Sequence, residues 1–203
     1  MIIRLEEEND YLKVEKMVRN SFWNIYRPGA FEHYIVHNLR ADESFIRDLA
    51  YVIEKDGKII AHINYSKGKI LFNNKKVIDG VVLGPISVDC DYQNQGYGSK
   101  LINYTLKLIE DRDIPFVVVI GDENYYHRFG FESASKYNLY LDGTDTNEEC
   151  PFFMIKIFKE DIDLLDGTFY NPDVFNVNQS DVDEFDNNFE YKEKLVLKGQ
   201  LEV

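Results

Sequence analysis

Residues 86–101 read Ile86-Ser87-Val88-Asp89-Cys90-Asp91-Tyr92-Gln93-Asn94-Gln95-Gly96-Tyr97-Gly98-Ser99-Lys100-Leu101. This pattern predicts a buried strand that ends in a polar turn, followed by a helix that opens with two glycines. The backbone N–H groups of a helix N-terminus point toward one spot, where the helix dipole favours negative charge. Glycines remove Cβ atoms, so a phosphate group can approach the backbone. The stretch therefore predicts a turn that binds a pyrophosphate.

The turn differs from two better-known phosphate motifs. Its glycines are not followed by the Lys-Ser/Thr pair of a nucleotide-triphosphate loop, and the third glycine of the dinucleotide fingerprint is missing. Gln93, Gln95 and Ser99 offer neutral donors, and Lys100 offers a positive charge nearby. Because Gly-x-Gly is common at ordinary helix starts, a specific function has to rest on a second motif.

The elements around this turn indicate an α+β fold. A hairpin is expected around Lys55-Asp56-Gly57, because apolar runs flank this turn sequence. Residues 81–88 are apolar on both faces and predict a central strand, but proline cannot donate to a ladder, so Gly84-Pro85 predicts a bulge or local splaying. A helix from Ser99 to about Asp111 and a buried strand at residues 115–120 then complete a parallel crossover. Further elements are expected as strands at residues 1–5, from 131 and at 152–158, and as helices at residues 11–22, 31–39, 124–128 and from 180.

A second motif lies just after the buried strand 115–120. It reads Asp122-Glu123-Asn124-Tyr125-Tyr126-His127-Arg128-Phe129-Gly130-Phe131. Together the two motifs resemble the GNAT superfamily of acetyl-CoA-dependent N-acetyltransferases. Its cofactor motif, Gln/Arg-x-x-Gly-x-Gly/Ala, is matched by Gln93, Gly96 and Gly98, and its tyrosine four residues before Gly-Phe is matched by Tyr126. The resemblance covers residues 1–158 and is strongest to a bacterial branch of predicted acetyltransferases.

The resemblance implies a mixed, mostly antiparallel sheet with a splayed parallel strand pair and flanking helices. Acetyl-CoA would be the cosubstrate, with no metal. In this fold the backbone groups of residues 86–88 pair with pantetheine, and the Val88 amide polarises the thioester carbonyl. The implied cofactor-binding residues are Ile86, Ser87, Val88, Gln93, Asn94, Gln95, Gly96, Tyr97, Gly98, Ser99, Tyr125 and Phe129.

The resemblance also implies direct attack by a primary amine, with Tyr126 as the general acid for the leaving thiolate. The base is open, because some relatives carry a Glu where this chain has Val82. Asp79 lies three residues earlier, His62 lies on a neighbouring strand, and a water chain or an already neutral amine would also suffice. Two other readings stay open: a non-catalytic acyl-CoA sensor or interaction protein on the same fold, and a transferase for longer acyl groups.

Charge and composition limit the classes of partner that the chain is expected to bind. The chain has 203 residues and a net charge of −13, of which residues 142–203 contribute −11 from 16 acidic and five basic side chains. Such a chain repels phosphate backbones, so nucleic-acid binding is not expected. No apolar run is long enough to span a membrane and no secretory signal is visible, so the expected location is the cytosol. The domain prediction is an acetyl-CoA-binding domain at 1–158 and an acidic extension at 159–203, and a homodimer stays open.

Other residues invite functional readings with simpler alternatives. His33 and His37 have a metal-chelating spacing, but no third ligand supports them, and a solvated helix face is the expectation. Aromatic residues near Arg27-Pro28-Gly29 could line the acceptor site or pack in the core. Cys90 lies beside the turn without a base partner in the sequence, so no catalytic role is expected.

Overall fold

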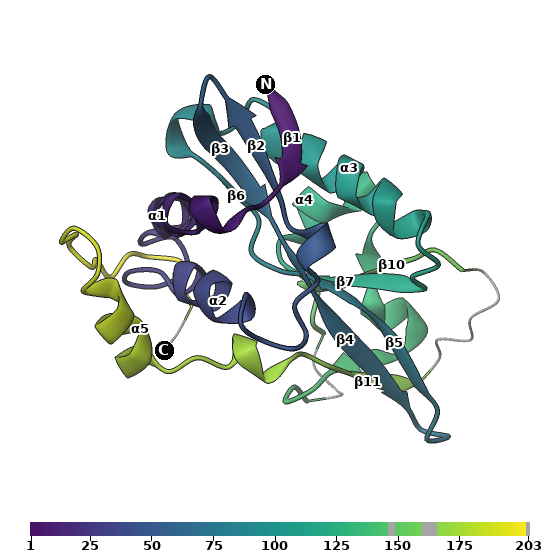
Figure 1. Ribbon diagram of the computed structural model, residues 1–203. Coiled ribbons are helices and arrows are strands. Elements are labelled where there is room, and N and C mark those ends of the chain that lie inside the picture. Colours follow the sequence, from purple (N-terminus) through teal and green to yellow (C-terminus); the bar gives the residue numbers. More distant parts are fainter. Residues whose placement is uncertain (146–148, 160–165, 202–203) are drawn as a thin grey trace. The chain divides into compact units, whose positions relative to one another are not determined.

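The computed structural model describes residues 1–145, 149–159 and 166–201, and Figure 1 shows its elements along the chain. The chain forms two compact units, each built around its own sheet. The first unit combines residues 1–64, 85–101 and 174 onward, and the second combines residues 65–84 and 102–173. The predicted boundary between residues 158 and 159 marks where the sequence resemblance ends, not where contacts within the chain separate. It stays a prediction.

The first unit contains a four-stranded antiparallel sheet. Its strands are β1 (Ile2–Leu5), β2 (Tyr51–Lys55), β3 (Lys58–Ile63) and β6 (Ser87–Val88), in the order β1-β2-β3-β6. The predicted hairpin is the β2–β3 pair, with Asp56 and Gly57 at positive φ in its turn. Positive φ suits glycine and, less readily, aspartate, which explains why this pair forms the turn.

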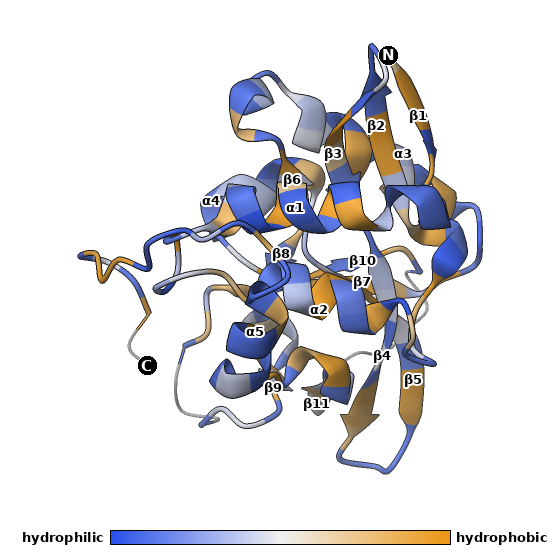
Figure 2. Cartoon of the chain, turned by 60° about the vertical axis from the view of Figure 1, so that its left-hand side comes forward, coloured by the Kyte–Doolittle hydropathy of each residue, from blue (hydrophilic) through white to orange (hydrophobic). Residues whose placement is uncertain are grey.

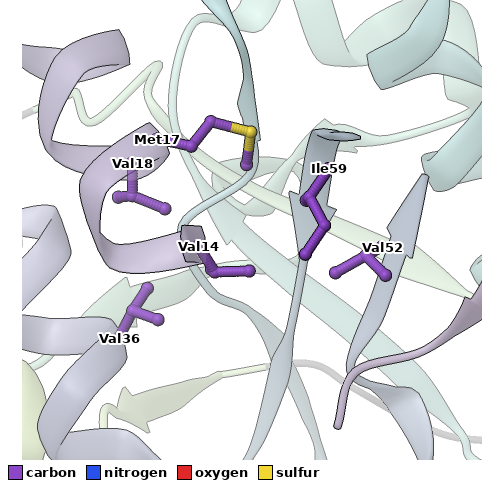
Figure 3. Close-up of a cluster of buried hydrophobic side chains, with 6 residues drawn as sticks. All are labelled: Val14, Met17, Val18, Val36, Val52 and Ile59. Carbon is purple, nitrogen blue, oxygen red and sulfur yellow. The ribbon is translucent and has the colours of Figure 1, made fainter. Parts of the chain in front are cut away.

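Two helices pack on this sheet through one apolar cluster. They are α1 (Tyr11–Phe22) and α2 (Glu32–Leu39), which lie at the predicted positions. Figure 2 shows that α1 carries both hydrophobic and hydrophilic residues, as the spacing of its apolar residues predicts. The buried cluster contains Val14, Met17, Val18, Val36, Val52 and Ile59 (Figure 3). Each fully buried aliphatic side chain of this kind contributes about 1.5–3 kcal/mol of transfer free energy.

The C-terminal segment belongs to the first unit and is tied to α1. Helix α5 (Gln179–Asp186) places Asp186 against Arg19, whose Nε and Nη2 donate to the two carboxylate oxygens at 2.6 and 3.0 Å. The Arg19 side chain is only 3% exposed, so this bidentate pair neutralises a buried charge. Beyond α5, Trp23 Nε1 donates to the Glu193 carbonyl at 3.0 Å. The chain from α5 to Glu193 is therefore held against α1, although its sequence signal is weak.

The second unit contains a seven-stranded mixed sheet in the order β8-β10-β7-β5-β4-β11-β9. Two neighbouring pairs, β5–β7 and β11–β9, are parallel, and the other neighbours run antiparallel. This mixture of strands and helices confirms the α+β prediction. The strands are β4 (Tyr65–Phe72), β5 (Val77–Leu83), β7 (Phe116–Ile120), β8 (Glu132–Ser133), β9 (Leu139–Leu141), β10 (Phe153–Ile157) and β11 (Gly167–Tyr170).

Two predicted strands are each divided between the sheets. The expected strand 81–88 becomes β5, which ends at Leu83, and β6, which begins at Ser87. The break falls at Gly84-Pro85, as expected from the missing N–H of proline. The apolar run from residue 58 is likewise interrupted at Asn64, between β3 and β4. Splaying was expected at the first break, whereas the second was not predicted, since apolar patterning alone does not show where a chain leaves a sheet.

Glycines admit aromatic rings onto the β4–β5 hairpin. Gly68 and Gly80 are directly opposite each other in the register. A Cβ at Gly80 would overlap the Phe116 ring, and a Cβ at Gly68 would lie 2.7 Å from the Phe169 ring. Both rings are fully buried, so the two glycines are the places where these rings fit.

The remaining helices follow the crossover order. Helix α3 (Tyr97–Glu110) begins two residues before its predicted start, and α4 (Glu123–Tyr126) follows β7. The described residues also form the short 3-10 helices η1 (Glu8–Asp10), η2 (Arg47–Leu49), η3 (Cys90–Tyr92), η4 (His127–Phe129), η5 (Ala134–Tyr137) and η6 (Asp173–Phe175).

Candidate active site

The predicted phosphate turn lies between β6 and α3 in the first unit. It starts with η3, where the Asp89 side chain accepts the Asp91 N–H at 3.1 Å. Asn94 and Gly96 then adopt positive φ values of 59° and 80°. Residues 93–96 are exposed, and a Cβ at Gly96 would meet no other atom within 4 Å. The backbone at this turn is therefore open to an incoming group.

The start of α3 supplies the donors of this turn. The Lys100 N–H bonds to the Gly96 carbonyl at 3.0 Å and closes the first helical turn. The N–H groups before Lys100 have no partner of this i−4 kind, because a helix leaves its first donors unsatisfied. Unsatisfied donors at a positive dipole end suit an anion.

Three lysines surround two tyrosines beside the turn. Lys55 and Lys58, from the β2–β3 hairpin, lie 5.3 and 5.2 Å from the ring centre of Tyr92, and Lys100 lies 5.1 Å from that of Tyr97. A hydrogen bond to Tyr97 raises the pKa of Lys55, and one to Asp89 raises the pKa of Lys58. Lys55 and Lys58 could not be selected from sequence, since strand pairing brings this hairpin to the turn.

Two glutamines predicted to bind the cofactor brace the turn itself. Gln93 Nε2 donates to the Val88 carbonyl at 3.2 Å, and Gln95 Nε2 donates to the Asp91 carbonyl at 3.1 Å. Each amide therefore uses one of its two N–H groups to hold the turn. Both side chains therefore hold the backbone of the turn in place.

The register of β6 orients the Val88 backbone. The Asp89 N–H bonds to the Ile60 carbonyl at 2.9 Å, and Val88 is opposite Ala61. In an antiparallel ladder, hydrogen-bonded and non-hydrogen-bonded pairs alternate, so Val88 occupies a non-hydrogen-bonded position. Its N–H and carbonyl point away from β3, and the carbonyl accepts the Ser21 hydroxyl at 2.8 Å. The N–H is a donor that the β3 ladder does not use.

The second motif is positioned in the second unit by a capped helix. The Asp122 side chain accepts the Asn124 N–H at 3.0 Å and caps α4. Tyr126 is 8% exposed, and its ring centre lies 5.1 Å from that of Tyr125 and 5.7 Å from that of Phe131. A Cβ at Gly121 would come within 2.6 Å of the Tyr126 ring, so this glycine leaves room for the tyrosine.

The Gly-Phe pair of this motif ends the helical segment. Gly130 has a φ of +82° and follows η4, where a left-handed residue is needed. A side chain there would also displace Lys156, whose Nζ donates to the Phe129 carbonyl at 2.9 Å. Phe129 is 7% exposed and lies against Tyr125, with ring centres 5.5 Å apart. The structure thus brings Tyr125, Tyr126 and Phe129 together in one aromatic group.

The candidate bases have different environments. Asp79 is exposed on β5, whereas Val82 is buried and apolar. His62 is fully buried on β3, with its Nε2 3.5 Å from Glu6 Oε1. Burial lowers the pKa of His62 to about 4, so its ring is neutral near pH 7.

The spaced histidines of α2 face separate carboxylates. His33 Nε2 is 3.3 Å from Asp186, and His37 Nδ1 is 2.9 Å from Glu15. His33 is fully buried, contrary to the expected solvated face, because α5 covers it. Throughout the described ranges, no group of three or more His, Cys, Asp or Glu side chains could hold a metal ion.

The aromatic residues near Pro28 differ in how deeply they are buried. Phe22 packs against the apolar cluster of α1 and the sheet, whereas Tyr26 is exposed.

Cys90 is an exposed free thiol whose Sγ lies 3.6 Å from the Asn20 carbonyl. Among the helices formed by the described residues, none is long and apolar enough to cross a membrane.

Comparison with known proteins identifies the family. The profile of the acetyltransferase (GNAT) domain matches residues 3–134, which is well over half of the chain. The chain belongs to the GNAT acetyltransferase family. Its match ends within η5, so the GNAT profile includes both the turn and the motif around Tyr126. The resemblance inferred from these two motifs is confirmed.

Relatives of this GNAT chain include two Escherichia coli K12 proteins. It is 28% identical to the uncharacterized N-acetyltransferase YhbS over 139 residues, which is 68% of this chain and 78% of YhbS. It is 30% identical to the uncharacterized N-acetyltransferase YjhQ over 104 residues, which is 50% of this chain and 55% of YjhQ.

Solved GNAT structures support the same assignment. The E. coli YhbS structure in complex with CoA has a TM-score of 0.72 and 26% identity, covering 87% of this chain and 92% of YhbS. A GNAT acetyltransferase from Brucella melitensis in complex with acetyl-CoA has a TM-score of 0.67 and 26% identity, covering 86% of this chain and 97% of that protein. The GNAT fold implied by the sequence is therefore confirmed.

Proposed function

We propose that this GNAT protein transfers the acetyl group of acetyl-CoA to a primary amine by direct attack. The observation that carries the proposal is the exposed stretch at residues 93–96, which leads into the N-terminus of α3 beside three lysines. Support also comes from the YhbS and B. melitensis relatives, which were crystallised with CoA and acetyl-CoA.

The turn binds the diphosphate in this proposal. The backbone N–H groups of residues 95–99 donate to the phosphate oxygens, and the open space at Gly96 allows that approach. Lys55 and Lys100 add positive charge to a chain whose net charge is −13, and Lys58 is paired with Asp89 at 2.9 Å. The wider cofactor set keeps Ile86, Ser87, Asn94, Tyr125 and Phe129 as proposed contacts.

The Val88 amide is the proposed oxyanion donor. Its N–H is turned away from β3 and is not used by that ladder. The N–H donates to the thioester carbonyl oxygen, where negative charge develops during attack. Such a donor typically contributes about 10²–10³-fold to the rate.

Tyr126 is the proposed general acid. Its hydroxyl gives a proton to the departing thiolate, and a positioned acid usually contributes about 10²–10⁴-fold. A thiol with a pKa near 8.5 leaves readily, so the contribution of Tyr126 is expected at or below the lower end of this range. Capping by Asp122 and packing on Gly121 support its fixed orientation.

A thiol-release assay with calorimetry tests this function. Acetyl-CoA is mixed with the protein and a panel of polyamines, aminoglycosides, amino acids and peptides, and free thiol is followed. We expect release with at least one amine, together with calorimetric binding of CoA. Gly98→Glu should abolish binding by steric and charge conflict, whereas Gly143→Glu, which adds the same charge outside the turn, should not. Tyr126→Phe should lower turnover with little change in acetyl-CoA affinity.

A non-catalytic acyl-CoA sensor is the second candidate. The observation that favours it is buried, apolar Val82 at the place where some relatives carry a glutamate. CoA binding without thiol release across the whole amine panel would support the sensor and contradict the transferase. Absence of CoA binding would contradict both.

A further inference from the structure

Three buried polar side chains gather at the junction of β3 and β6. His62 is 0% exposed, Asn64 1% and Ser87 4%. Both ring nitrogens of His62, both amide atoms of Asn64 and the Ser87 hydroxyl have no hydrogen-bond partner within the described part of the chain. Buried polar atoms are nearly always hydrogen-bonded, and those without a protein partner commonly bond to an ordered water molecule.

The strand register places His62 and Ser87 on one face. His62 is directly opposite Ser87 on β6, and directly opposite residues direct their side chains to the same side of a sheet. On its other side His62 is opposite Val52, a member of the apolar cluster beneath α1 and α2. The polar group therefore lies on the helix-covered face of the four-stranded sheet.

A buried group of paired charges lies beside His62. Glu6 Oε1 is 3.5 Å from its Nε2, and Arg40 donates to Glu6 at 2.6 Å and to Glu15 at 2.6 Å. These three charged side chains are each at most 7% exposed. Burial has the largest effect and lowers the pKa of His62, Glu6 raises it and Arg40 lowers it, so the ring is neutral near pH 7 and available to take a proton. Exposed His37 also contacts Glu15, at the outer end of this group.

The same strand carries the proposed oxyanion donor. Ser87 directly precedes Val88, and its side chain and that of His62 lie on the same face. A water bonded to the Ser87 hydroxyl and the His62 ring would therefore lie close to the strand on which the thioester carbonyl is held in the proposed function.

We propose that His62 accepts the proton of the acceptor amine through a water held by His62, Asn64 and Ser87. An N–H bond of the ammonium breaks and its proton passes to the water, which gives a proton to a ring nitrogen of His62. The freed lone pair forms the N–C bond to the acetyl carbon, and the C–S bond breaks. Tyr126 protonates the thiolate and then takes the second proton of the attacking nitrogen, which is now the amide nitrogen of the product. Histidinium, beside Glu6, returns its proton to solvent after product release. This inference rests on the proposed function and supplies the base that Val82 cannot.

The test compares His62→Gln with His33→Gln at two pH values. His33 is a matched control because it is also fully buried in the same unit but lies outside the group around Glu6. With the fastest acceptor of the amine panel, His62→Gln should lower kcat/KM about 100-fold at pH 7. The loss should shrink to about threefold or less at pH 9.5, where much more of an amine with a pKa near 10.4 is already neutral. His33→Gln should show no such pH-dependent loss.

Two further measurements distinguish a loss of the base from a loss of cofactor binding or of folding. Calorimetry should show unchanged acetyl-CoA affinity for His62→Gln, and thermal unfolding should show that it folds. If it does not fold, Ser87→Ala replaces it, with an expected loss of about tenfold at pH 7 that also shrinks at pH 9.5. An equal loss at both pH values, or none, would overturn the role of His62 alone. Wild-type protein that releases no thiol with any amine would overturn the proposed function instead.

Discussion

The two units differ in what their cores contain. The first unit buries Glu6, Glu15, Arg19, His33 and His62, whereas the described part of the second unit contributes only Ser66 and Thr105 to the buried polar side chains. In the second unit, aromatic rings instead fill the places that glycines leave open. Charged groups are costly to bury unless they are paired, so the first unit depends on ion pairs such as Arg19–Asp186 and Arg40–Glu6, and the second on shape. The unit with the costlier core is also the one that carries the proposed acetyl-CoA turn.

The largest expected effect follows from breaking the Arg19–Asp186 pair. Asp186→Asn leaves the Arg19 guanidinium buried without a counter-charge, and the free energy of unfolding should fall by about 3–5 kcal/mol. Asp183→Asn is the matched control on the same helix, because Asp183 is half exposed and pairs with Lys194 near the surface. That change should cost less than about 1 kcal/mol. Denaturant unfolding measures both, and equal losses would contradict the contrast between the two pairs.

A pH titration of stability addresses the buried histidines. Burial lowers the pKa of both His33 and His62 to about 4, against 6.5 in the unfolded chain. Below pH 6.5 the unfolded chain binds protons that the folded chain does not, so stability falls as the pH drops from 6.5 toward 4. The full window corresponds to about 3 kcal/mol for each histidine.

Denaturant unfolding at several pH values measures this slope. The carboxylates also titrate near the acid end, so His33→Gln and His62→Gln serve as comparisons and should each flatten the slope between pH 6.5 and 5. An unchanged slope in both variants would show that the histidines do not cause the loss.

Overpacking tests the second unit. Gly80→Ala places a methyl group against the buried Phe116 ring, and the free energy of unfolding should fall by about 1–3 kcal/mol. Asp79→Ala changes the exposed neighbour on the same strand and should cost less than about 0.5 kcal/mol. Similar small losses for both would mean that the ring and the glycine are not closely fitted.

The smallest expected effect concerns the cap of α4. Asp122→Ala removes the acceptor for the Asn124 N–H and should lower the free energy of unfolding by about 1 kcal/mol. Asp122→Ser retains a capping oxygen and should recover most of the loss. Thermal unfolding of the two variants makes the comparison, and no difference between them would remove the capping role.

Local pattern was sufficient to predict much of this fold. The β2–β3 hairpin, helices α1–α3 and strand β7 were predicted, because a turn sequence or an apolar period marks each in a short window. Strand β11 was missed, since it forms by pairing with β4 nearly 100 residues earlier in the chain. Burial of His33 was also missed, because α5 covers it from about 150 residues away. Such contacts leave no periodic trace in either partner.

The candidate site shows the same limit. The turn and Tyr126 could be selected because each motif is contiguous, and their assigned roles stay predictions. Lys55 and Lys58 could not be selected, since strand pairing rather than sequence proximity brings them to the turn. The polar group around His62 needed both the β3–β6 register and the burial of Ser87 to become visible.

The opposed Gly68 and Gly80 carry a consequence for how the hairpin aligns during folding. Slippage of β4 past β5 by two residues would keep every side chain on its own face, so apolar patterning alone would tolerate the misalignment. Only the native alignment sets the two bare backbone positions side by side, with Phe116 over one and Phe169 over the other. A hairpin shifted by two residues would place side chains where these two rings pack, so the two glycines disfavour misaligned hairpins.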